Sequence, residues 1–335
     1  MKAYEIKDAF SLDNLRLAER PEPHPGHGQV LVKVRAVSLN YRDLLVVKGV
    51  YNPKLPLPLI PFSDGAGEVV AVGDGVTRVR VGDRVAGIFM QKWLAGEIDD
   101  RGARSALGGD LDGMLAELVV LSEEGVVQIP EHLTFEEGAT LPCAAVTAWH
   151  AVVESGIRPG DSVLILGTGG VSLFALQFAR LAGARVIATS GSDEKLERVK
   201  QLGASDGINY RVVPEWDRPT RELTGKTGVD LVVEVGGAGT LPRSLRAVRV
   251  GGQISLIGVL SGGAGEVNPL PVVMKKVRLQ GIFVGSRAMF EAMNRAIALH
   301  QLRPVIDRVF PFAVAREALH YLESGAHFGK VCIRL

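Results

Sequence analysis

The sequence predicts an α/β fold in which a doubly wound parallel sheet follows a separate β-barrel-like region. Short apolar runs and frequent turn signals fill residues 1–125, a pattern typical of a compact barrel. From residue 135 onward, strand-length apolar runs alternate with segments of helical period, which indicates a parallel sheet with helices on both faces. Residues 162–198 show this most clearly, because strand, glycine turn, helix and strand follow one another as a βαβ unit.

The 335 residues are enough for two domains of ordinary size. The change of period places a first domain at residues 1–125 and a second at 126–275. Residues 276–335 are expected to add the last strand of the second domain and then return to the first.

Composition excludes several classes of function. Hydrophobic residues make up 47% and charged residues 22%, which are globular values. The net charge is +1 and no basic run with interleaved aromatics occurs, so nucleic acid is not an expected partner. The two distant cysteines, Cys143 and Cys332, form no disulfide framework and suit a reducing cytoplasm. No signal-peptide core or membrane-spanning run is expected.

The N-terminal region is expected to hold one short helix at 41–48, with Asn40 as its cap, and a long loop at 90–113. A second helical region begins at residue 135 behind a capping box formed by Thr134 and Glu137, and it is expected to run in two parts through 149–154. Strands of the first region are expected at 3–6, 30–37, 68–72, 84–88 and 116–121.

The second region and the C-terminal part alternate strongly between strand and helix. Strands are expected at 163–166, 185–189, 207–209, 231–235, 253–257, 279–284, 308–311 and 330–334. Helices are expected at 171–182, 193–202, 215–224, 240–248, 271–276, 287–300 and 314–324.

The glycine turn of the βαβ unit predicts a Rossmann dinucleotide site. Gly167 permits the tight turn, and Gly169 lets the backbone approach a pyrophosphate. Gly170 completes the turn, and the helix that starts near Val171 directs its free N–H groups at the phosphates. Ser172 replaces the third glycine of the usual pattern and is still small enough to pack helix against strand.

Several motifs together resemble the medium-chain dehydrogenase/reductase superfamily, and within it the zinc-free quinone oxidoreductase-like branch. They run from end to end: GQVLVKVRAVSLNYRDLLVVKGVY (28–51), DGAGEVVAVGDGV (64–76), VGDRV (81–85), DGMLAE (112–117), LPCAAVTAW (141–149), LILGTGGVS (164–172), LGASDGINY (202–210) and FGKVCI (328–333). The resemblance implies a GroES-like catalytic domain, a Rossmann domain inserted into it, and an active site in the cleft between them.

By the same resemblance, the catalytic zinc ligands of related alcohol dehydrogenases fall on Asn40, Ser63 and Cys143. Only the cysteine is a ligand residue, and a catalytic zinc needs about three protein ligands. The loop at 88–113, where the family's structural zinc lobe would lie, has no cysteine. The chain is therefore expected to work without a metal. Cys143 is then a small residue that lines the cleft rather than a nucleophile.

The cofactor is expected to be NADP(H). The second strand of the βαβ unit ends in 189–192 without the acidic residue that binds an NAD ribose. Asp193 and Glu194 follow as first-turn acids of the next helix. A 2′-phosphate could therefore be bound by Ser190, Lys195 and Tyr210, of which the last two resemble family residues that contact it.

The resemblance also implies a set of residues that border the nicotinamide, although small residues at strand ends are common in any parallel sheet. They are Thr147, Gly258, Val259, Val284, Gly285 and Ser286. Lys330 resembles a C-terminal cofactor or cleft lysine of the family, with a plain surface charge as the alternative.

Tyr51 is the candidate proton donor, because it matches a tyrosine that zinc-free reductases place over the nicotinamide; a packed turn residue is the alternative. Asn40 could hydrogen-bond substrate or cofactor, whereas Arg42 and Asp43 are interpreted as a local ion pair. Two aromatic residues of the long loop, Phe89 and Trp93, could line an apolar pocket or belong to the domain core.

These residues predict an NADPH-dependent oxidoreductase that transfers hydride to a quinone or an α,β-unsaturated carbonyl without a catalytic metal. A zinc-dependent alcohol dehydrogenase with atypical ligands is one alternative, and an NADPH-binding protein with little turnover is another. Pairing of the edge strand near 279–284 with a second copy predicts a homodimer.

Overall fold

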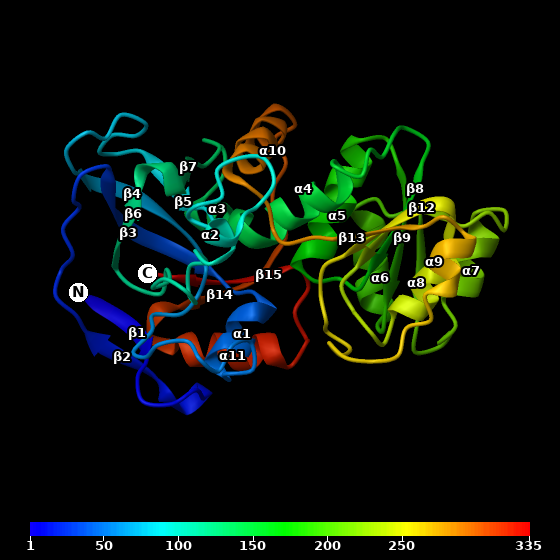
Figure 1. The fold of residues 1–335 in the computed structure, drawn as a ribbon, viewed down its shortest axis with the longest axis horizontal. Helices are drawn as coiled ribbons and strands as arrows, with labels where there is room; N and C mark the ends of the chain where they lie inside the picture. The colour runs from blue at the N-terminus through cyan, green and yellow to red at the C-terminus, as the bar shows by residue number, and fades with distance from the viewer. The chain divides into compact units, whose positions relative to one another are not determined.

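The computed structural model describes residues 1–335 and divides them into two compact units (Figure 1). Unit 1 comprises Met1–Val146 and Gly285–Leu335, and unit 2 comprises Thr147–Val284. The first boundary lies about twenty residues beyond the expected position, because the segment after residue 125 forms strand β7 and pairs with β5 of unit 1. The second boundary follows the last strand of the parallel sheet.

The sheet of unit 1 is a strongly bent, mostly antiparallel structure of seven strands. Its order is β14-β15-β3-β4-β5-β7, and β6 pairs with the free half of β3. The C-terminal return predicted from the sequence is present, since Cys332 of β15 lies opposite Ser38 of β3. The strands are β3 (Gln29–Ser38), β4 (Asp64–Val72), β5 (Arg84–Gly87), β6 (Leu118–Ser122), β7 (Val126–Gln128), β14 (Ile306–Pro311) and β15 (Lys330–Arg334).

A separate hairpin joins β1 (Lys2–Ile6) to β2 (Leu15–Glu19) in antiparallel register. Strand β2 was not expected from the sequence. Only Leu15 of its five residues is buried, so its apolar alternation is too weak to reveal a strand.

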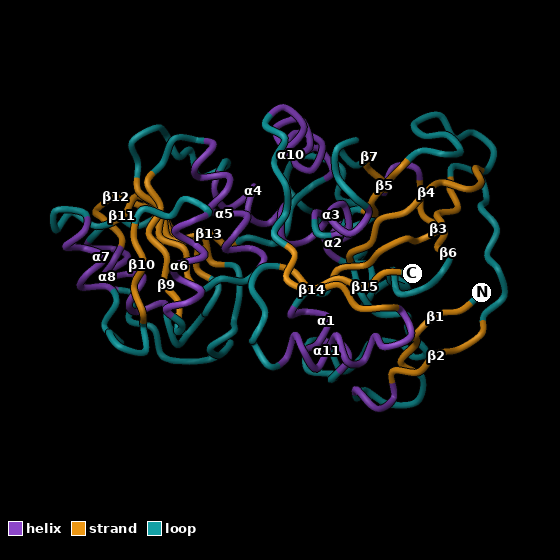
Figure 2. Tube along the Cα trace, turned by 180° about the vertical axis from the view of Figure 1, so that it is seen from behind, coloured by secondary structure: helices purple, strands orange, loops and turns teal.

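The helices of unit 1 begin where the sequence placed their caps. Helix α1 starts directly after Asn40, whose backbone N–H donates to Asp43. The capping box at Thr134 and Glu137 forms in both directions, with distances of 3.2 and 2.8 Å. Figure 2 shows α1 and α11 side by side. The helices are α1 (Tyr41–Val47), α2 (Asp100–Ala103), α3 (Phe135–Ala139), α10 (Arg287–Leu299) and α11 (Ala315–Glu323), with short 3₁₀ turns at Leu12–Asn14, Glu123–Gly125 and Phe312–Val314.

The segment between α3 and α4 forms a π-helical turn at Leu141–Ala145, which continues into α4 (Val146–Val152). The sequence had indicated a helix in two parts here. The wide turn brings the backbone of Cys143 toward the start of β4, where its N–H binds Asp64.

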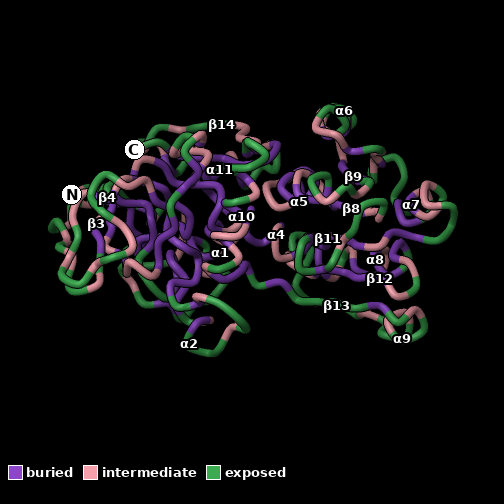
Figure 3. Tube along the Cα trace, turned by 90° about the horizontal axis from the view of Figure 1, so that it is seen from above, coloured by how far each residue is buried: buried purple, intermediate pink, exposed green.

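Unit 2 contains a six-stranded, all-parallel sheet in the order β10-β9-β8-β11-β12-β13. Numbered within the unit, this is the 3-2-1-4-5-6 order of dinucleotide-binding sheets. Figure 3 shows its central strands buried, with α5 next to β8 and β9 and α8 next to β11 and β12. The strands are β8 (Ser162–Leu166), β9 (Arg185–Ser190), β10 (Asp206–Asn209), β11 (Val229–Glu234), β12 (Val248–Leu256) and β13 (Arg278–Gly281).

The crossover helices of unit 2 match the expected segments within two or three residues. They are α5 (Gly170–Leu181), α6 (Asp193–Gln201), α7 (Asp217–Leu223), α8 (Leu241–Ala247) and α9 (Leu270–Met274). Strand β13 is shorter than expected because the chain leaves the sheet after Gly281. None of the helices in the protein has the length and apolar character required to cross a bilayer.

Gly67 of β4 provides a test of the unit 1 sheet. A β-carbon at this position would lie 2.2 Å from the carbonyl oxygen of Lys33 on β3, so the paired strands would have to separate. We expect Gly67→Ala to lower the apparent melting temperature by about 5 °C or more. The control is Gly281→Ala on β13, where no atom lies within 4 Å of the new carbon. Equal melting temperatures in a thermal scan would contradict the strand packing described here.

Candidate functional site

The turn between β8 and α5 has the backbone geometry of a phosphate-binding loop. Gly167 has a φ of +74°, which a residue with a β-carbon rarely adopts. Neither Gly167 nor Gly169 has an atom within 4 Å of where a β-carbon would stand, so both face open space. Ser172 Oγ donates to the carbonyl of Leu166 at 2.7 Å and ties the helix to the strand.

This turn fits the pyrophosphate of a dinucleotide. Helix α5 has twelve residues, of which Gly170 and Val171 are the first two. Its N-cap residue is Gly169, and no side chain forms a capping hydrogen bond there. Its first N–H groups and the positive end of its dipole are therefore available to an anion. The sequence prediction placed the same residues here, and their role in binding stays a prediction.

The end of β9 and the end of β10 meet at Ser190. The carbonyl of Ser190 accepts the N–H of Tyr210 at 3.0 Å, and its Oγ accepts the N–H of Ser192 at 3.2 Å. Asp193 accepts a hydrogen bond from Nδ2 of Asn209 and lies in the first turn of α6. It is therefore the first-turn acid of this helix, as the sequence indicated.

Two side chains cover Gly191 at this point. A β-carbon on Gly191 would lie 2.9 Å from both Tyr210 Oη and Arg211 Nε. Lys195 belongs to the first turn of α6, where its N–H donates to Ser192 Oγ. Sequence reasoning found Lys195 and Tyr210 but missed Arg211. The cation that directly follows Tyr210 was the available signal.

A buried carboxylate at the end of β11 holds the loop and the helix that follow this strand. Glu234 is fully buried, and it accepts the N–H groups of Gly236 and Gly237 at 2.7 and 3.1 Å. The hydroxyls of Thr240 and Ser244 also donate to it. The sequence analysis did not single out this acid, because it reads as part of an apolar strand.

The loop after β12 comes close to the loop after β11. A β-carbon on Gly258 would lie 2.4 Å from the carbonyl oxygen of Val235, so only glycine fits there. Val259 is half exposed. The predicted nicotinamide role of Gly258 and Val259 is compatible with this position at the carboxyl end of the sheet.

Val284 has a φ of +56°, a costly conformation for a β-branched residue. Its carbonyl lies 2.8 Å from Nδ1 of His150 on α4, which holds this strained segment in place. Thr147, near the start of α4, is buried. Sequence reasoning missed His150.

Gly285 and Ser286 belong to unit 1. Ser286 is buried and caps α10, since its Oγ accepts the N–H of Met289. A β-carbon on Gly285 would lie 2.6 Å from Val146. Their role near a nicotinamide stays a prediction.

In unit 1, a chain of hydrogen bonds joins the predicted residues Asn40 and Lys330. The ammonium of Lys330 donates to the Oδ1 of Asn40 at 2.5 Å and to the carbonyl of Leu39 at 2.6 Å. Lys330 is 3% exposed and Asn40 is 9% exposed. Lys330 is thus a buried internal cation, which excludes the surface-charge alternative, while a cofactor contact by Lys330 stays a prediction.

The chain continues from Asn40 to a buried acid. Asn40 Nδ2 donates to Ser63 Oγ at 3.3 Å, and Ser63 Oγ donates to Asp64 Oδ1 at 2.7 Å. The other carboxylate oxygen of Asp64 accepts the N–H of Cys143 at 3.1 Å. Burial raises the pKa of Asp64, whereas the charge of Lys330 lowers it.

A second buried acid, Asp43, supports the same region from α1. Its carboxylate accepts the N–H of Asn40 at 2.7 Å and the N–H of Ser63 at 3.3 Å. Burial raises the pKa of Asp43 to about 6, against the opposing effect of Arg42. The predicted ion pair with Arg42 is present at 4.0 Å.

Arg42 also contacts two aromatic rings and a backbone carbonyl. Its guanidinium carbon lies 5.0 Å from the ring centroids of both Tyr51 and Phe89, and its Nη1 donates to the carbonyl of Leu107 at 2.7 Å. Tyr51 is 44% exposed. Arg42 therefore sets the position of the candidate proton donor, a role that the sequence did not suggest.

The two loop aromatics belong to the core. Phe89 and Trp93 are 3% and 6% exposed, and the indole N–H of Trp93 donates to Gly96 within the loop. Burial favours the core alternative over the pocket-lining one. The expected loop itself holds one short helix, α2, at Asp100–Ala103.

The residues at the family's zinc-ligand positions do not fit a catalytic zinc. Asn40 Oδ1 is occupied by the ammonium of Lys330, which would repel a divalent cation. Burial and the neighbouring Asp64 raise the pKa of Cys143 above its usual range and disfavour the thiolate that zinc requires. No group of three or more His, Cys, Asp or Glu side chains is arranged to hold a metal ion.

Comparison with known proteins gives consistent matches over the whole chain. Residues 26–131 match the family "Alcohol dehydrogenase GroES-like domain", and residues 170–299 match "Zinc-binding dehydrogenase". A zinc-type alcohol dehydrogenase-like protein of Schizosaccharomyces pombe is 44% identical over 99% of both chains. The human quinone oxidoreductase is 31% identical over 91% of this chain and 88% of its own.

A solved structure named "NAD-dependent alcohol dehydrogenase" superposes with a TM-score of 0.92, at 37% identity and full coverage of both chains. Sequence and fold agree, and both domains of the architecture expected from the resemblance are present. The chain therefore belongs to the medium-chain dehydrogenase/reductase superfamily of oxidoreductases.

Proposed function

We propose that this oxidoreductase uses NADPH to reduce a quinone or an α,β-unsaturated carbonyl compound without a catalytic metal. The observation that carries the proposal is the hydrogen-bonded chain from Lys330 to Asp64, which occupies the positions of the family's zinc ligands. Removing the proton of an alcohol with a pKa near ~16 needs a Lewis acid. A conjugated carbonyl or quinone needs only hydrogen-bond donors, because it delocalises the charge that it gains.

The βαβ turn of unit 2 would hold the cofactor. The N–H groups at Gly170 and Val171 suit the pyrophosphate, with Gly167 and Gly169 allowing its close approach. NADPH, when bound, supplies the hydride. The loop after β11, which the Glu234 carboxylate holds, and the loop after β12, which packs against it at Gly258, would provide a fixed edge of the sheet for the nicotinamide.

The end of β9 favours a 2′-phosphate over a free ribose hydroxyl. It carries Ser190 in place of an acid, and Tyr210 and Arg211 cover Gly191 beside it. Lys195 adds a second cation from the first turn of α6. Arginine binds phosphate through a fork of N–H donors, which adds geometric selectivity to charge. One similar structure is named NAD-dependent, so the names of similar proteins do not support NADPH over NADH. The proposed preference for NADPH is therefore based on the residues of this chain.

Tyr51 would donate the proton that completes the reduction. It is the exposed partner of Arg42, and its hydroxyl is the accessible acid among the candidate residues of unit 1. The cation of Arg42 stabilises the position of the Tyr51 ring.

Consumption of NADPH tests this function against a panel of quinones, enones and simple alcohols, with and without a chelator. We expect turnover with quinones or enones that chelation leaves unchanged. Tyr51→Phe should lower kcat for enones about 10- to 100-fold without changing the Kd of NADPH, because it removes only a proton donor. Tyr41→Phe, another exposed tyrosine of unit 1, is the control.

Three outcomes would contradict the proposal. Alcohol oxidation that is lost with stoichiometric zinc would support a zinc-dependent dehydrogenase. Tight NADPH binding without any turnover would support a binding protein. Unchanged enone rates in Tyr51→Phe would remove this residue from the mechanism.

Arg211→Gln tests the cofactor preference. Loss of a charge-assisted hydrogen bond to the 2′-phosphate should weaken NADPH binding about 10- to 100-fold and leave NADH binding unchanged. The control is Arg218→Gln, whose side chain is exposed and forms an ion pair with Glu215. Fluorescence titration with both cofactors measures the effect. Equal losses of affinity for NADPH and NADH would show that Arg211 does not bind the 2′-phosphate.

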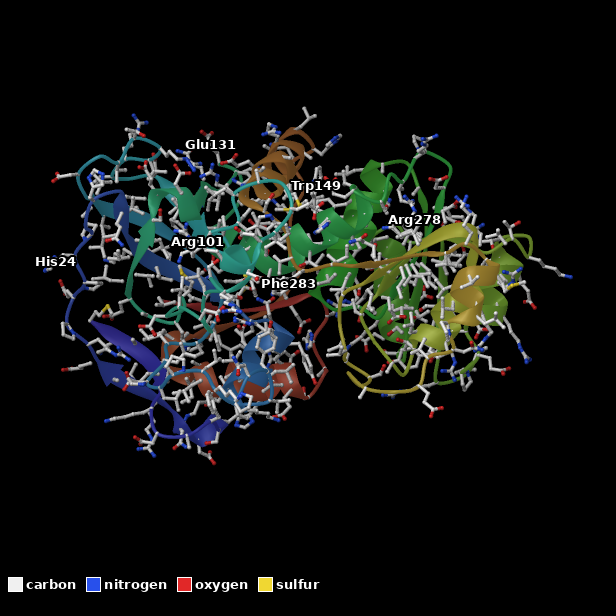
Figure 4. The ribbon with its side chains drawn as sticks, viewed as in Figure 1. His24, Arg101, Glu131, Trp149, Arg278 and Phe283 are labelled. Atoms are coloured by element: carbon white, nitrogen blue, oxygen red, sulfur yellow. The ribbon has the colours of Figure 1, made fainter.

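We also propose that two copies pair through β13, the open edge of the parallel sheet. All four residues of β13, including Leu279, are exposed, and Phe283, which is labelled in Figure 4, adds apolar surface just beyond the strand. A strand edge with unpaired backbone groups is a template for a second strand.

Light scattering should then give twice the 35.8 kDa chain mass. Leu279→Arg should shift the protein toward the monomer, since it adds charge to the paired edge. Leu181→Arg, at a site of similar exposure on α5, should not. A monomeric mass for the unmodified protein would overturn the pairing.

A further inference from the structure

We propose that Glu234 is a positioning residue for hydride transfer, because its buried carboxylate fixes the two loops beside which the nicotinamide would lie. The adenosine half of the cofactor would be held by other residues, so the two halves depend on different parts of unit 2. The inference rests on the proposed function and adds to it the group that determines where the reacting ring lies.

The carboxylate of Glu234 is enclosed by donors from the residues that follow it. Gly236 and Gly237 each donate a backbone N–H to one of its oxygens, at 2.7 and 3.1 Å. The hydroxyl of Thr240 donates to the same oxygen at 2.5 Å, and the hydroxyl of Ser244 donates to the other oxygen. Glu234 has no solvent exposure, so water cannot replace these donors. A buried carboxylate that lost them would be costly, and the loop after β11 must therefore keep this arrangement.

The loop after β12 is joined to the loop after β11 by further hydrogen bonds. Ser261 donates both its N–H and its hydroxyl to the carbonyl of Gly236, at 2.7 and 2.8 Å. The N–H of Ala238 donates in the opposite direction, to the carbonyl of Gly262 at 3.0 Å. Gly236 thus binds the Glu234 carboxylate through its N–H and Ser261 through its carbonyl. A displacement of Gly236 would therefore move both loops.

The joined loops determine the place of Gly258 and Val259, which are predicted to border the nicotinamide. The N–H of Gly258 donates to the main-chain carbonyl of Glu234, and the N–H of Leu260 donates to that of Val235, both at 3.3 Å. Gly258 lies so close to the end of β11 that a β-carbon on it would stand 2.4 Å from the Val235 carbonyl oxygen. Val259 is half exposed, so a ligand can reach it.

The residues proposed for the 2′-phosphate belong to another part of the same sheet. Ser190 ends β9, and Tyr210 and Arg211 follow β10, whereas Glu234 ends β11. In the order β10-β9-β8-β11, two strand spacings separate β9 from β11, which amounts to about 10 Å. A change at Glu234 should therefore disturb the nicotinamide half of the cofactor and leave the adenosine half in place.

A purely structural role for Glu234 makes a different prediction. Loss of the carboxylate would then lower stability and weaken every ligand of unit 2 alike. If Glu234 positions the nicotinamide loops, its loss should spare ligands that contain only the adenosine half. The fragment 2′,5′-ADP contains the adenosine and its 2′-phosphate but no nicotinamide, so it separates the two cases.

The test is Glu234→Ala, with the Kd of NADPH and the Kd of 2′,5′-ADP measured by calorimetry. We expect the Kd of 2′,5′-ADP to stay within about twofold and the Kd of NADPH to rise about 5- to 10-fold. The rate of NADPH oxidation in a single turnover should fall about 100-fold, because a misplacement of about 1 Å between reacting groups has an effect of that size. Glu234→Gln should restore part of both losses, since its amide oxygen can still accept the N–H of Gly236.

Asp230→Asn is the matched control, because it removes a charge from the amino end of the same strand. Asp230 accepts the N–H and the hydroxyl of Ser162 at 2.7 and 2.8 Å and also pairs with Arg249. This variant should lower the melting temperature and leave the ratio of the two Kd values unchanged. If Glu234→Ala does not fold, Glu234→Gln takes its place, with a smaller rise expected in the same ratio.

An equal rise in both Kd values, or an unchanged ratio in every folded variant of Glu234, would overturn its positioning role. A wild-type protein that binds both ligands but oxidises NADPH with none of the acceptors would instead refute the proposed function, and the ratio of Kd values would still report on Glu234. Binding of neither ligand to the wild type would overturn both.

Discussion

Two buried carboxylates determine how unit 1 is assembled. Asp43 and Asp64 are completely inaccessible, and a buried charge is tolerated only where donors surround it. The donors come from three separated parts of the chain: Asn40 before α1, Ser63 before β4, and the π-helical turn at Cys143. Lys330 at the start of β15 adds a positive charge beside the two acids and donates to Asn40. Each element must adopt its observed path for the acids to be satisfied. The polar centre therefore fixes the geometry of the fold as well as that of the site.

In unit 2, hydrogen bonds to backbone groups hold the loops at one edge of the sheet. Its parallel strands end at one edge, and the loops after them are held by Ser190, Glu234 and the carbonyl of Val284. The N-terminal end of α5 has no side-chain cap. A helix end can remain available to an anion only when the surrounding loops do not fold over it. The loops of unit 2 are held in place, and the N-terminal end of α5 therefore stays open.

The sequence was most informative where periodicity and turn residues are strong. The βαβ unit around Gly167, the capping box at Thr134 and the strand at 330–334 all follow from local patterns, and the structure contains them. The domain boundary at residue 125 could not be placed correctly, because β7 is short and its pairing with β5 is a long-range contact. Strand β2 was missed for its weak alternation.

The site was predicted less completely than the fold. The sequence indicated Asn40, Tyr51 and Lys330 as separate candidates, but it could not show that Lys330 and Asn40 are in contact across 290 residues. Arg42 was interpreted as an ion-pair partner because Asp43 is adjacent, whereas its stacking on Tyr51 and Phe89 depends on tertiary packing. Glu234 and His150 bind backbone groups, and such partners leave no signature in a single sequence.

The discontinuous composition of unit 1 has a consequence for synthesis of the chain. Unit 2 consists of one continuous segment and can close its sheet as soon as residue 284 has been made. Unit 1 must wait, because β15 pairs with β3 and ends at Arg334, next to the last residue. The amide of Asn40 acquires its fixed orientation only when Lys330 arrives. During translation unit 2 is therefore complete before unit 1, and a chain that stopped before residue 330 would lack this cation altogether.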